Sequence, residues 1–419
     1  MDRRAVVRRG LLVGSLAFAG CNGLLDSSTD GSDGVTTQPH SNTRTPGSKA
    51  NGIETALDTS FSVSSGVGGF EDLTVLDSGD YVLVGTRTSA DGRASGWVLR
   101  ADSQGRKRWS RTTDASALYG VTTTSNGDLL AVGRAGGSGG PVNAGWVHRF
   151  TPDGTTRWAN AYDGGQHAVL KAGVPTANGF LLAGVHEITS RGGATGWLLE
   201  LGSDGTVAGE RVFDGGHYRV FNAIVRTGNG RFALVGSARE TRDGDSSGLL
   251  VGIDGQRATR FRRRYTEATA NVFRGAVASD GGVRCCGEVS TTPAESDENE
   301  DAWLLEAADG GTERWSTTRD RQHGDRLWDL AVAPDGSALA VGQTNVTGQG
   351  TQTGLVLAVA ADGTIQHVRT LGNERGGDPD AITGVVRRPS GGYTATGVKN
   401  VTQSSAGYES SGWLLELGV

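Results

Sequence analysis

The sequence predicts an all-β fold in which one four-stranded unit is repeated seven times. An apolar run that closes on a glycine recurs seven times, at intervals of 48 to 55 residues. After each of these glycines comes a polar loop, and then a second apolar run that opens on glycine or alanine. The chain contains 68 Gly among 419 residues, which suits many short strands joined by tight turns. The closing glycines are Gly85, Gly133, Gly184, Gly236, Gly287, Gly342 and Gly397.

The two apolar runs set the order of strands within each repeat. The run NGDLLAVG, which ends at Gly133, is expected to form the second strand of its repeat, and GWVHRF, from Gly145, the third. A strand such as Trp328–Val332 precedes the second strand, and one such as Arg157–Tyr162 follows the third. Glycine turns separate the first strand from the second and the third from the fourth, which indicates antiparallel hairpins.

Seven four-stranded antiparallel repeats of about 50 residues describe a seven-bladed β-propeller over residues 57–419. The last repeat stops in its third strand, at Gly412–Leu417, so it lacks an outer strand. We expect Thr59–Val63, ahead of the first repeat, to complete this C-terminal blade and close the ring. An open solenoid is the alternative, but solenoids need polar end caps, and the sequence shows none.

Residues 1–20 are interpreted as an export signal. Arg8 and Arg9 precede an apolar run of about ten residues, which is too short to cross a membrane as a helix. This arrangement resembles a twin-arginine signal peptide, and Phe18–Cys21 resembles a lipobox. The resemblance implies that a lipid on Cys21 anchors the protein to the outer face of the cell membrane. A plain signal peptide with an incidental cysteine is the alternative.

Residues 21–56 are expected to form a flexible tether between the lipid and the propeller. They are rich in Ser, Thr, Gly and Asp and contain almost no large apolar residue after Leu25. Such a segment cannot bury enough apolar surface to offset the entropy lost on ordering.

The charge balance excludes one class of partner. Lys and Arg number 40 against 46 Asp and Glu, for a net charge of −6. A mildly acidic chain lacks the basic surface that nucleic acid requires. Only four of the basic residues are lysines. This bias resembles that of secreted proteins of halophilic archaea, although a G+C-rich genome would produce it as well.

Three repeats carry Gly-x-x-x-Trp between their third and fourth strands, at Gly105–Trp109, Gly154–Trp158 and Gly311–Trp315. With the aspartate before each glycine, the motif resembles the blade motif of pyrroloquinoline-quinone (PQQ) propellers and, more faintly, the Asp-box of sialidase-like propellers. The resemblance implies that each tryptophan docks two neighbouring blades. The resemblance in overall architecture covers residues 57–419, whereas the motif itself is present in only three blades.

Two sets of polar residues are candidate ligand contacts. His167, His217 and His323 lie in connections between repeats, which open onto one face of a propeller; neutral imidazole is a good ligand for transition metals. Solvated turn residues are the alternative for these histidines. The second set lies on first strands and is expected to face the central channel, with a solvated channel as the alternative. Its members are Lys171, Asn222, Arg274, Asp329 and Thr383.

Three further features have structural interpretations. Cys285 and Cys286 are neighbours in one strand and are expected to be a buried structural pair rather than a vicinal disulfide or a metal site. The acidic run 295–301 offers carboxylates but lacks the spacing of a calcium loop. Asn345 and Asn400 begin Asn-Val-Thr triplets and are candidate glycosylation sites.

The sequence therefore predicts an exported, lipid-anchored propeller that acts as a non-catalytic binding or scaffolding module. It contains no Gly-x-Ser-x-Gly elbow, P-loop or His-Glu-x-x-His motif. Besides the membrane, its expected partner is an unidentified protein or small molecule, bound by a monomeric ring without a cofactor or metal. The alternative is a quinoprotein-like oxidoreductase, with PQQ and Ca²⁺, or a carbohydrate-active propeller enzyme.

Overall fold

The computed structural model describes most of the chain from residue 52 onward, together with one short segment before it. The described ranges are 35–38, 52–63, 67–89, 91–136, 144–165, 167–189, 191–291, 300–319, 324–345, 352–372, 380–404 and 407–419. Arg8, Arg9, Cys21 and His323 lie outside these ranges. No helix among the described residues is long and apolar enough to cross a membrane.

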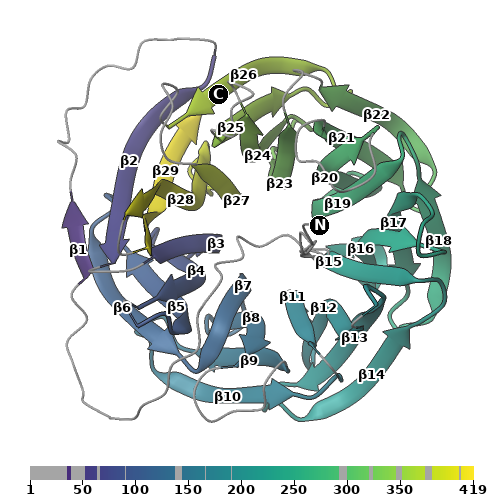
Figure 1. Ribbon diagram of the computed structural model, residues 1–419, viewed down its shortest axis with the longest axis horizontal. Coiled ribbons are helices and arrows are strands. Elements are labelled where there is room, and N and C mark those ends of the chain that lie inside the picture. The colour runs from purple at the N-terminus through teal and green to yellow at the C-terminus, as the bar shows by residue number, and fades with distance from the viewer. Residues whose placement is uncertain are drawn as a thin grey trace, which may run out of the picture.

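The fold is all-β, and its strands group into antiparallel units of four that surround a common axis (Figure 1). Strands β2 to β29 fit the expected seven blades. We name the strands of each blade A to D from the axis outward. Blade 1 contains β3 (Val67–Val75), β4 (Tyr81–Thr88), β5 (Ala94–Ala101) and β6 (Lys107–Thr113). Blade 2 contains β7 (Ala115–Thr123), β8 (Leu129–Ala135), β9 (Gly145–Phe150) and β10 (Thr156–Tyr162).

The next four blades repeat this order. Blade 3 contains β11 (Val169–Pro175), β12 (Gly179–Ile188), β13 (Ala194–Gly202) and β14 (Val207–Phe213). Blade 4 contains β15 (Tyr218–Thr227), β16 (Arg231–Arg239), β17 (Ser246–Ile253) and β18 (Thr259–Tyr265). Blade 5 contains β19 (Ala270–Ser279), β20 (Gly282–Ser290), β21 (Glu300–Ala308) and β22 (Glu313–Arg319). Blade 6 contains β23 (Asp325–Val332), β24 (Ala338–Asn345), β25 (Gln352–Val359) and β26 (Ile365–Leu371).

Blade 7 draws its strands from both ends of the described chain. Its strands A to C are β27 (Ala381–Arg387), β28 (Tyr393–Ser404) and β29 (Gly407–Gly418). Strand β2 (Glu54–Val63) pairs antiparallel with β29 in the outer position, with Phe61 opposite Gly412.

The segment expected to be a flexible tether contains two stretches of strand. Strand β1 (Val35–Gln38) pairs with β2 as a fifth strand of blade 7, and β2 itself begins three residues before position 57. An outer strand offers unpaired N–H and C=O groups, so even a polar segment can pair with it.

The closing glycines mark a close approach between strands A and B. A Cβ added to Gly287 would lie 1.9 Å from the carbonyl oxygen of Val272, and one added to Gly342 would lie 1.8 Å from that of Arg326. A Cβ added to any of the other five closing glycines would lie 2.0 to 2.1 Å from a carbonyl oxygen of its own strand A. No side chain fits at this position, which explains why every repeat has glycine there.

The glycine that opens strand C makes room for the next blade. A Cβ added to Gly412 would lie 2.2 Å from the ring of Phe70 in blade 1, and one added to Gly248 would lie 2.5 Å from the ring of Phe273 in blade 5. These two phenylalanine rings also stack within their own blades, on Trp97 at 4.2 Å and on Trp303 at 4.1 Å. The apolar core therefore runs between successive blades.

The two cysteines of β20 contribute to this core from opposite faces. Cys285 packs in a cluster with Phe273 and Trp303, and Cys286 in a cluster with Leu304 and Leu327. Both are free, buried thiols, and burial raises the pKa of each. They occupy the place of small apolar residues, as expected.

The tryptophans of the Gly-x-x-x-Trp motif contact the following blade. Trp109 Nε1 donates a hydrogen bond of 3.1 Å to the carbonyl of Pro152, and Trp158 Nε1 donates one of 3.1 Å to that of Ser203. Trp315 packs against Gly363, where an added Cβ would lie 2.5 Å from the ring. Each tryptophan therefore docks its own blade onto the next.

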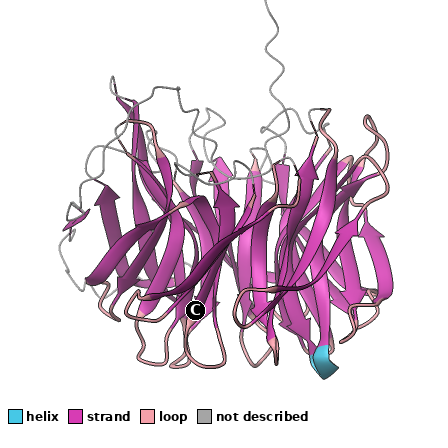
Figure 2. Ribbon diagram, turned by 90° about the horizontal axis from the view of Figure 1, so that it is seen from below, coloured by secondary structure: helices cyan, strands magenta, loops and turns pink. Residues whose placement is uncertain are grey.

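The two faces of the ring differ in their connections. The A–B and C–D turns lie on the face that we call the turn face. The short 3-10 helix η1 (Gly228–Gly230), cyan in Figure 2, belongs to the A–B turn of blade 4 and marks this face. The B–C and D–A connections lie on the opposite face, which we call the loop face.

Candidate functional site at the ring axis

Every A strand carries a bulge, and the bulge places one side chain per blade near the axis. The pairing register between strands A and B shifts by one residue in all seven blades, directly after a buried apolar residue. The seven extra residues are partly buried. We call them the axial belt: Glu71, Tyr119, Lys171, Asn222, Arg274, Trp328 and Thr383.

Four of the five residues predicted to face the channel lie in the axial belt, and the fifth does not. Lys171, Asn222 and Thr383 occupy belt positions, as does Arg274. Asp329 does not, because the apolar residue before the bulge in blade 6 is Leu327 and Trp328 is the extra residue.

The sequence reasoning also missed Glu71 and Tyr119, although a signal was present. They follow Phe70 and Leu118, which occupy the place that Leu170 has in blade 3.

Several polar groups near the axis link one blade to the next. The carboxylate of Asp72 accepts a hydrogen bond of 2.8 Å from the Val121 N–H, and that of Asp329 accepts one of 2.9 Å from the Val385 N–H. Asn222 Nδ2 donates to the carbonyl of Phe273 at 2.8 Å. The hydroxyl of Thr383 in blade 7 donates to the carbonyl of Phe70 in blade 1 at 2.7 Å. These groups have a structural role at four blade junctions.

Two cations of the belt lie against aromatic rings of the belt. Lys171 Nζ is 3.8 Å from the centre of the Tyr119 ring, and Arg274 Cζ is 4.3 Å from that of Trp328. Such contacts attract a cation to the ring face and hold it in place. Arg274 also forms an ion pair with Glu288 of its own blade. The belt thus offers two positioned cations with flat apolar surfaces beside them.

The surrounding strands change the protonation of the acidic and basic groups at the axis. Burial raises the pKa of Asp72 to about 6. Burial, aided by the negative charge of Asp72, raises the pKa of Asp329 to about 8. Burial also raises the pKa of Glu71 and lowers that of Lys171 to about 8. Protein on all sides disfavours charge here, so the axis contains groups that titrate near neutral pH.

The histidines of the loop face do not form a metal site among the described residues. His167 is exposed and has a left-handed backbone, with φ of 63°. His217 is partly buried, and its N–H donates to the carbonyls of Arg239 and Glu240. No group of three or more His, Cys, Asp or Glu side chains in the described ranges could hold a metal ion.

The remaining predicted positions have simple surroundings. Asn345 ends β24 and is partly buried, and Asn400 lies within β28; whether either is glycosylated stays a prediction. Glu300 and Asp301 are the part of the acidic run that the structure describes; both lie in β21, and Glu300 forms an ion pair with Arg326.

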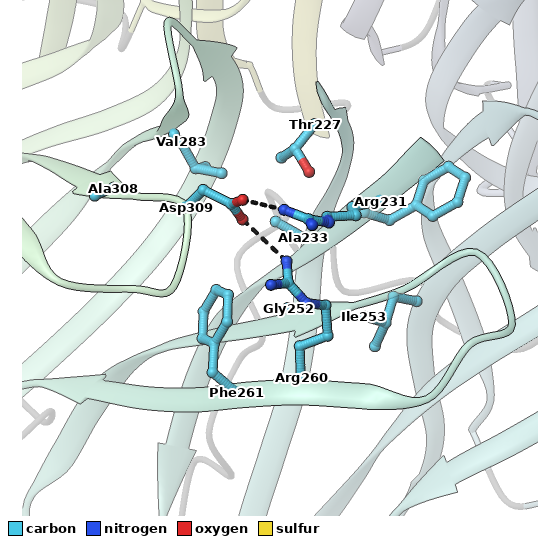
Figure 3. Close-up of a pocket in the computed structure, with 12 residues that line it drawn as sticks. Thr227, Arg231, Ala233, Gly252, Ile253, Arg260, Phe261, Val283, Ala308 and Asp309 are labelled. Carbon is cyan, nitrogen blue, oxygen red and sulfur yellow. Dashed lines mark hydrogen bonds and ion pairs between the residues drawn. The ribbon is translucent and has the colours of Figure 1, made fainter. Parts of the chain in front are cut away.

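A depression on the turn face lies between blades 4 and 5 and is shown in Figure 3. It has a volume of about 260 Å³, which includes open solvent. Arg231 and Arg260 both point at the carboxylate of Asp309 and form ion pairs with it, beside the ring of Phe261. Because Asp309 engages both guanidinium groups, this depression is a weaker candidate than the axial belt.

Comparison with known proteins shows similarity of fold only. No family model and no curated protein matches the chain. A protein of unknown function from Dyadobacter fermentans is similar in structure, with a TM-score of 0.50 and 13% identity over 88% of this chain and 100% of that chain. The WD40 β-propeller domain of Doa1 aligns with a TM-score of 0.49 and 12% identity, over 87% of this chain and 97% of that chain. The Dos1 propeller aligns with a TM-score of 0.47 and 8% identity, over 83% and 77%.

Proposed function

We propose that this protein is a non-catalytic binding module: a seven-bladed ring, closed by β2 and held at the outer face of the membrane through a lipid on Cys21. Its ligand binds at the axial belt. The observation that supports this proposal is the convergence of seven chemically different side chains, one from each A strand. Apolar clusters already hold neighbouring blades together, so the charged and aromatic side chains of the belt suit recognition.

The belt favours a small ligand that carries a carboxylate and several hydroxyl groups, such as an acidic sugar. The carboxylate would pair with Lys171, whose ammonium is positioned over the Tyr119 ring, whereas Arg274 already pairs with Glu288. The apolar face of the sugar ring would lie on Tyr119 or Trp328, and its hydroxyls would bond to Glu71. A few polar groups beside aromatic surfaces are the usual composition of small-molecule sites.

Titration calorimetry with D-glucuronate tests the ligand class, with D-glucose as the neutral comparison. We expect glucuronate to bind and glucose to bind at least tenfold more weakly. Lys171→Gln should weaken glucuronate binding at least tenfold, since it removes a positioned charge. Lys107→Gln is the matched control, because Lys107 lies on the outer strand of blade 1, far from the axis. Equal affinity in both variants, or no binding by the unmodified protein, would contradict the proposal.

Membrane fractionation tests the anchor separately. Cys21→Ser should release the protein from membranes or block its processing. Replacement of Arg8 and Arg9 by lysine should leave the precursor inside the cell. A Cys21→Ser protein that is processed normally and stays wholly with the membranes would show that the lipid is not on Cys21.

A further inference from the structure

Three arginines gather where blade 4 meets blade 3. Arg262 and Arg264 alternate on the outer strand β18, opposite Val251 and Leu249 of β17. Those two apolar residues pack in the cluster that joins blade 4 to blade 3, so this face of the blade is the one turned to blade 3. Arg219 comes from the other edge of the blade, on the innermost strand β15. We call Arg219, Arg262 and Arg264 the arginine cluster.

The cluster has too few carboxylates for its charge. Glu240 forms an ion pair with Arg264, and its Oε1 lies 3.7 Å from Arg219 Nη2. Asp214 accepts a hydrogen bond from Arg219 Nη1 through its backbone carbonyl, and its charge acts on the same guanidinium. Arg262 forms no ion pair with any described residue. Among the described residues, one carboxylate therefore contacts the arginine cluster directly, and it reaches only Arg219 and Arg264.

Arg219 is the member whose situation points to a ligand. Its side chain is 3% exposed, and its buried Nε–H has no acceptor among the described residues. Burial, together with the positive charges of Arg262 and Arg264, lowers its pKa. A buried charged donor without an acceptor is costly. Charges on an outer strand also protect its edge from aggregation, but Arg219 lies on an inner strand, where that role does not apply.

We propose that the arginine cluster binds a phosphate group. The planar guanidinium donates two parallel hydrogen bonds to a phosphate, so Arg262 and Arg264 can hold the group at the rim while the Nε of Arg219 donates from below. The phosphate supplies both the missing negative charge and the missing acceptor. It comes from free phosphate or from a phospholipid headgroup. This site is separate from the axial belt and does not depend on the function proposed there.

Thermal unfolding of the full chain tests the site. Sodium phosphate should raise the melting temperature by roughly 2–4 °C over sodium chloride of equal ionic strength, because a ligand that binds only the folded state stabilises it. The variant R262Q/R264Q should lose this rise. R260Q/R263Q is the matched control on the same strand: it removes the same charge, but Arg260 is paired with Asp309 and Arg263 packs towards Gly311 of blade 5. The control should keep the rise.

Vesicle sedimentation identifies the source of the phosphate. Both variants are compared in a Cys21→Ser background, so that no lipid can attach to the chain. Weaker binding of R262Q/R264Q than of R260Q/R263Q to phosphatidylglycerol vesicles assigns the site to a headgroup. Equal vesicle binding, with the phosphate effect on melting still lost, assigns it to free phosphate. An equal melting rise in R262Q/R264Q and R260Q/R263Q overturns the site.

Discussion

The tryptophan near the start of strand C donates a hydrogen bond in most blades that contain it, and one substitution on the outer strand removes the acceptor in blade 2. In blades 1, 3, 5 and 7 its indole N–H donates to an acceptor on the outer strand. The pairs are Trp97 with Ser110, Trp197 with Glu210, Trp303 with Ser316 and Trp413 with Asp58, at 2.7 to 2.9 Å. In blade 2 the corresponding position is Ala159, and the buried Nε1 of Trp146 has no acceptor among the residues that the structure describes.

Ala159→Ser should therefore stabilise the protein. The new hydroxyl would stand where Ser110 stands in blade 1, within reach of Trp146. Satisfying a buried donor is worth about 1 kcal/mol or more, so the midpoint of thermal unfolding should rise. Ala159→Val, which fills more space than serine but has no hydroxyl, serves as the control. A rise that is equal in both variants would mean that packing, not the hydrogen bond, is responsible.

The carboxylates at the axis make stability depend on pH. Asp72 and Asp329 have pKa values raised to about 6 and about 8, from an ordinary value near 3.8. The folded state therefore binds more protons than the unfolded chain between pH 3.8 and 8, so stability falls as pH rises through that range. The pKa of Lys171 is lowered to about 8, so this group affects stability only above that pH, where it makes stability rise with pH.

We expect the melting temperature to decrease from pH 5 to pH 8 and this decrease to shrink in Asp329→Asn. The amide keeps an oxygen that can accept from the Val385 N–H, while the group that titrates near pH 8 is removed. Asp335→Asn is the control, because hydrogen bonds from Ser337 lower the pKa of that exposed aspartate and confine its effect to more acidic pH. An unchanged slope in Asp329→Asn would show that this carboxyl does not titrate in the range.

At the scale of the strand, the bulge in strand A and the closing glycine of strand B form one device. The bulge turns an extra residue toward the axis, and the carbonyl just before the apolar residue then lies against the glycine of strand B, as Val272 lies against Gly287. Belt position and glycine therefore occur together in every repeat. The glycine that recurs in every repeat therefore has a steric cause.

Gly287→Ala should be strongly destabilising for this reason. Its Cβ would lie 1.9 Å from the carbonyl oxygen of Val272, so either β19 or β20 would have to move. Overpacking commonly costs about 1–3 kcal/mol, and a clash with backbone should reach the upper end of that range. Gly209→Ala is the matched strand control, since its nearest neighbour would be Glu200 Oε2 at 3.7 Å. Equal denaturant midpoints for the two variants would refute the steric explanation.

At the scale of the whole molecule, blade 7 joins segments that are more than 300 residues apart. Phe61 of β2 is fully buried and packs edge-on against Phe70 of blade 1, with ring centres 6.1 Å apart. Asp58 of β2 accepts from Trp413 Nε1 and forms an ion pair with Lys399. The outer strand therefore contacts both its own blade and the next one.

Removing the contacts of β2 should weaken the entire ring. Phe61→Ala should cost about 3–5 kcal/mol, a large part of the roughly 5–15 kcal/mol that stabilises a typical domain. Deletion of residues 54–63 should lower the melting temperature further and promote aggregation through the exposed edge of β29. Deletion of residues 22–34, which precede β1, is the control and should leave melting unchanged. Melting curves that match the intact protein after loss of β2 would rule out closure through this strand.

Much of the architecture was predictable because it depends on short-range patterns. The glycines that recur every 48 to 55 residues report contacts within one hairpin, so the repeat and its four strands can be recognised without a structure. The sequence predicted that Thr59–Val63 would complete the last blade, and Thr59 to Ser62 do pair with its third strand. The strand at Val35–Gln38 was not predictable, because its polar residues carry no alternating apolar pattern.

The sequence by itself determined the repeat, the order of its strands and the places where only glycine fits, since each depends on residues close together in the chain. Tertiary structure alone decided which side chains meet. The bulge adds a residue that simple alternation does not count, so Trp328 rather than Asp329 joins the belt. Blades also bring together residues about 45 positions apart, as with Arg219 and Arg264, whose shared environment arises only when two edges of a blade and its neighbour are assembled.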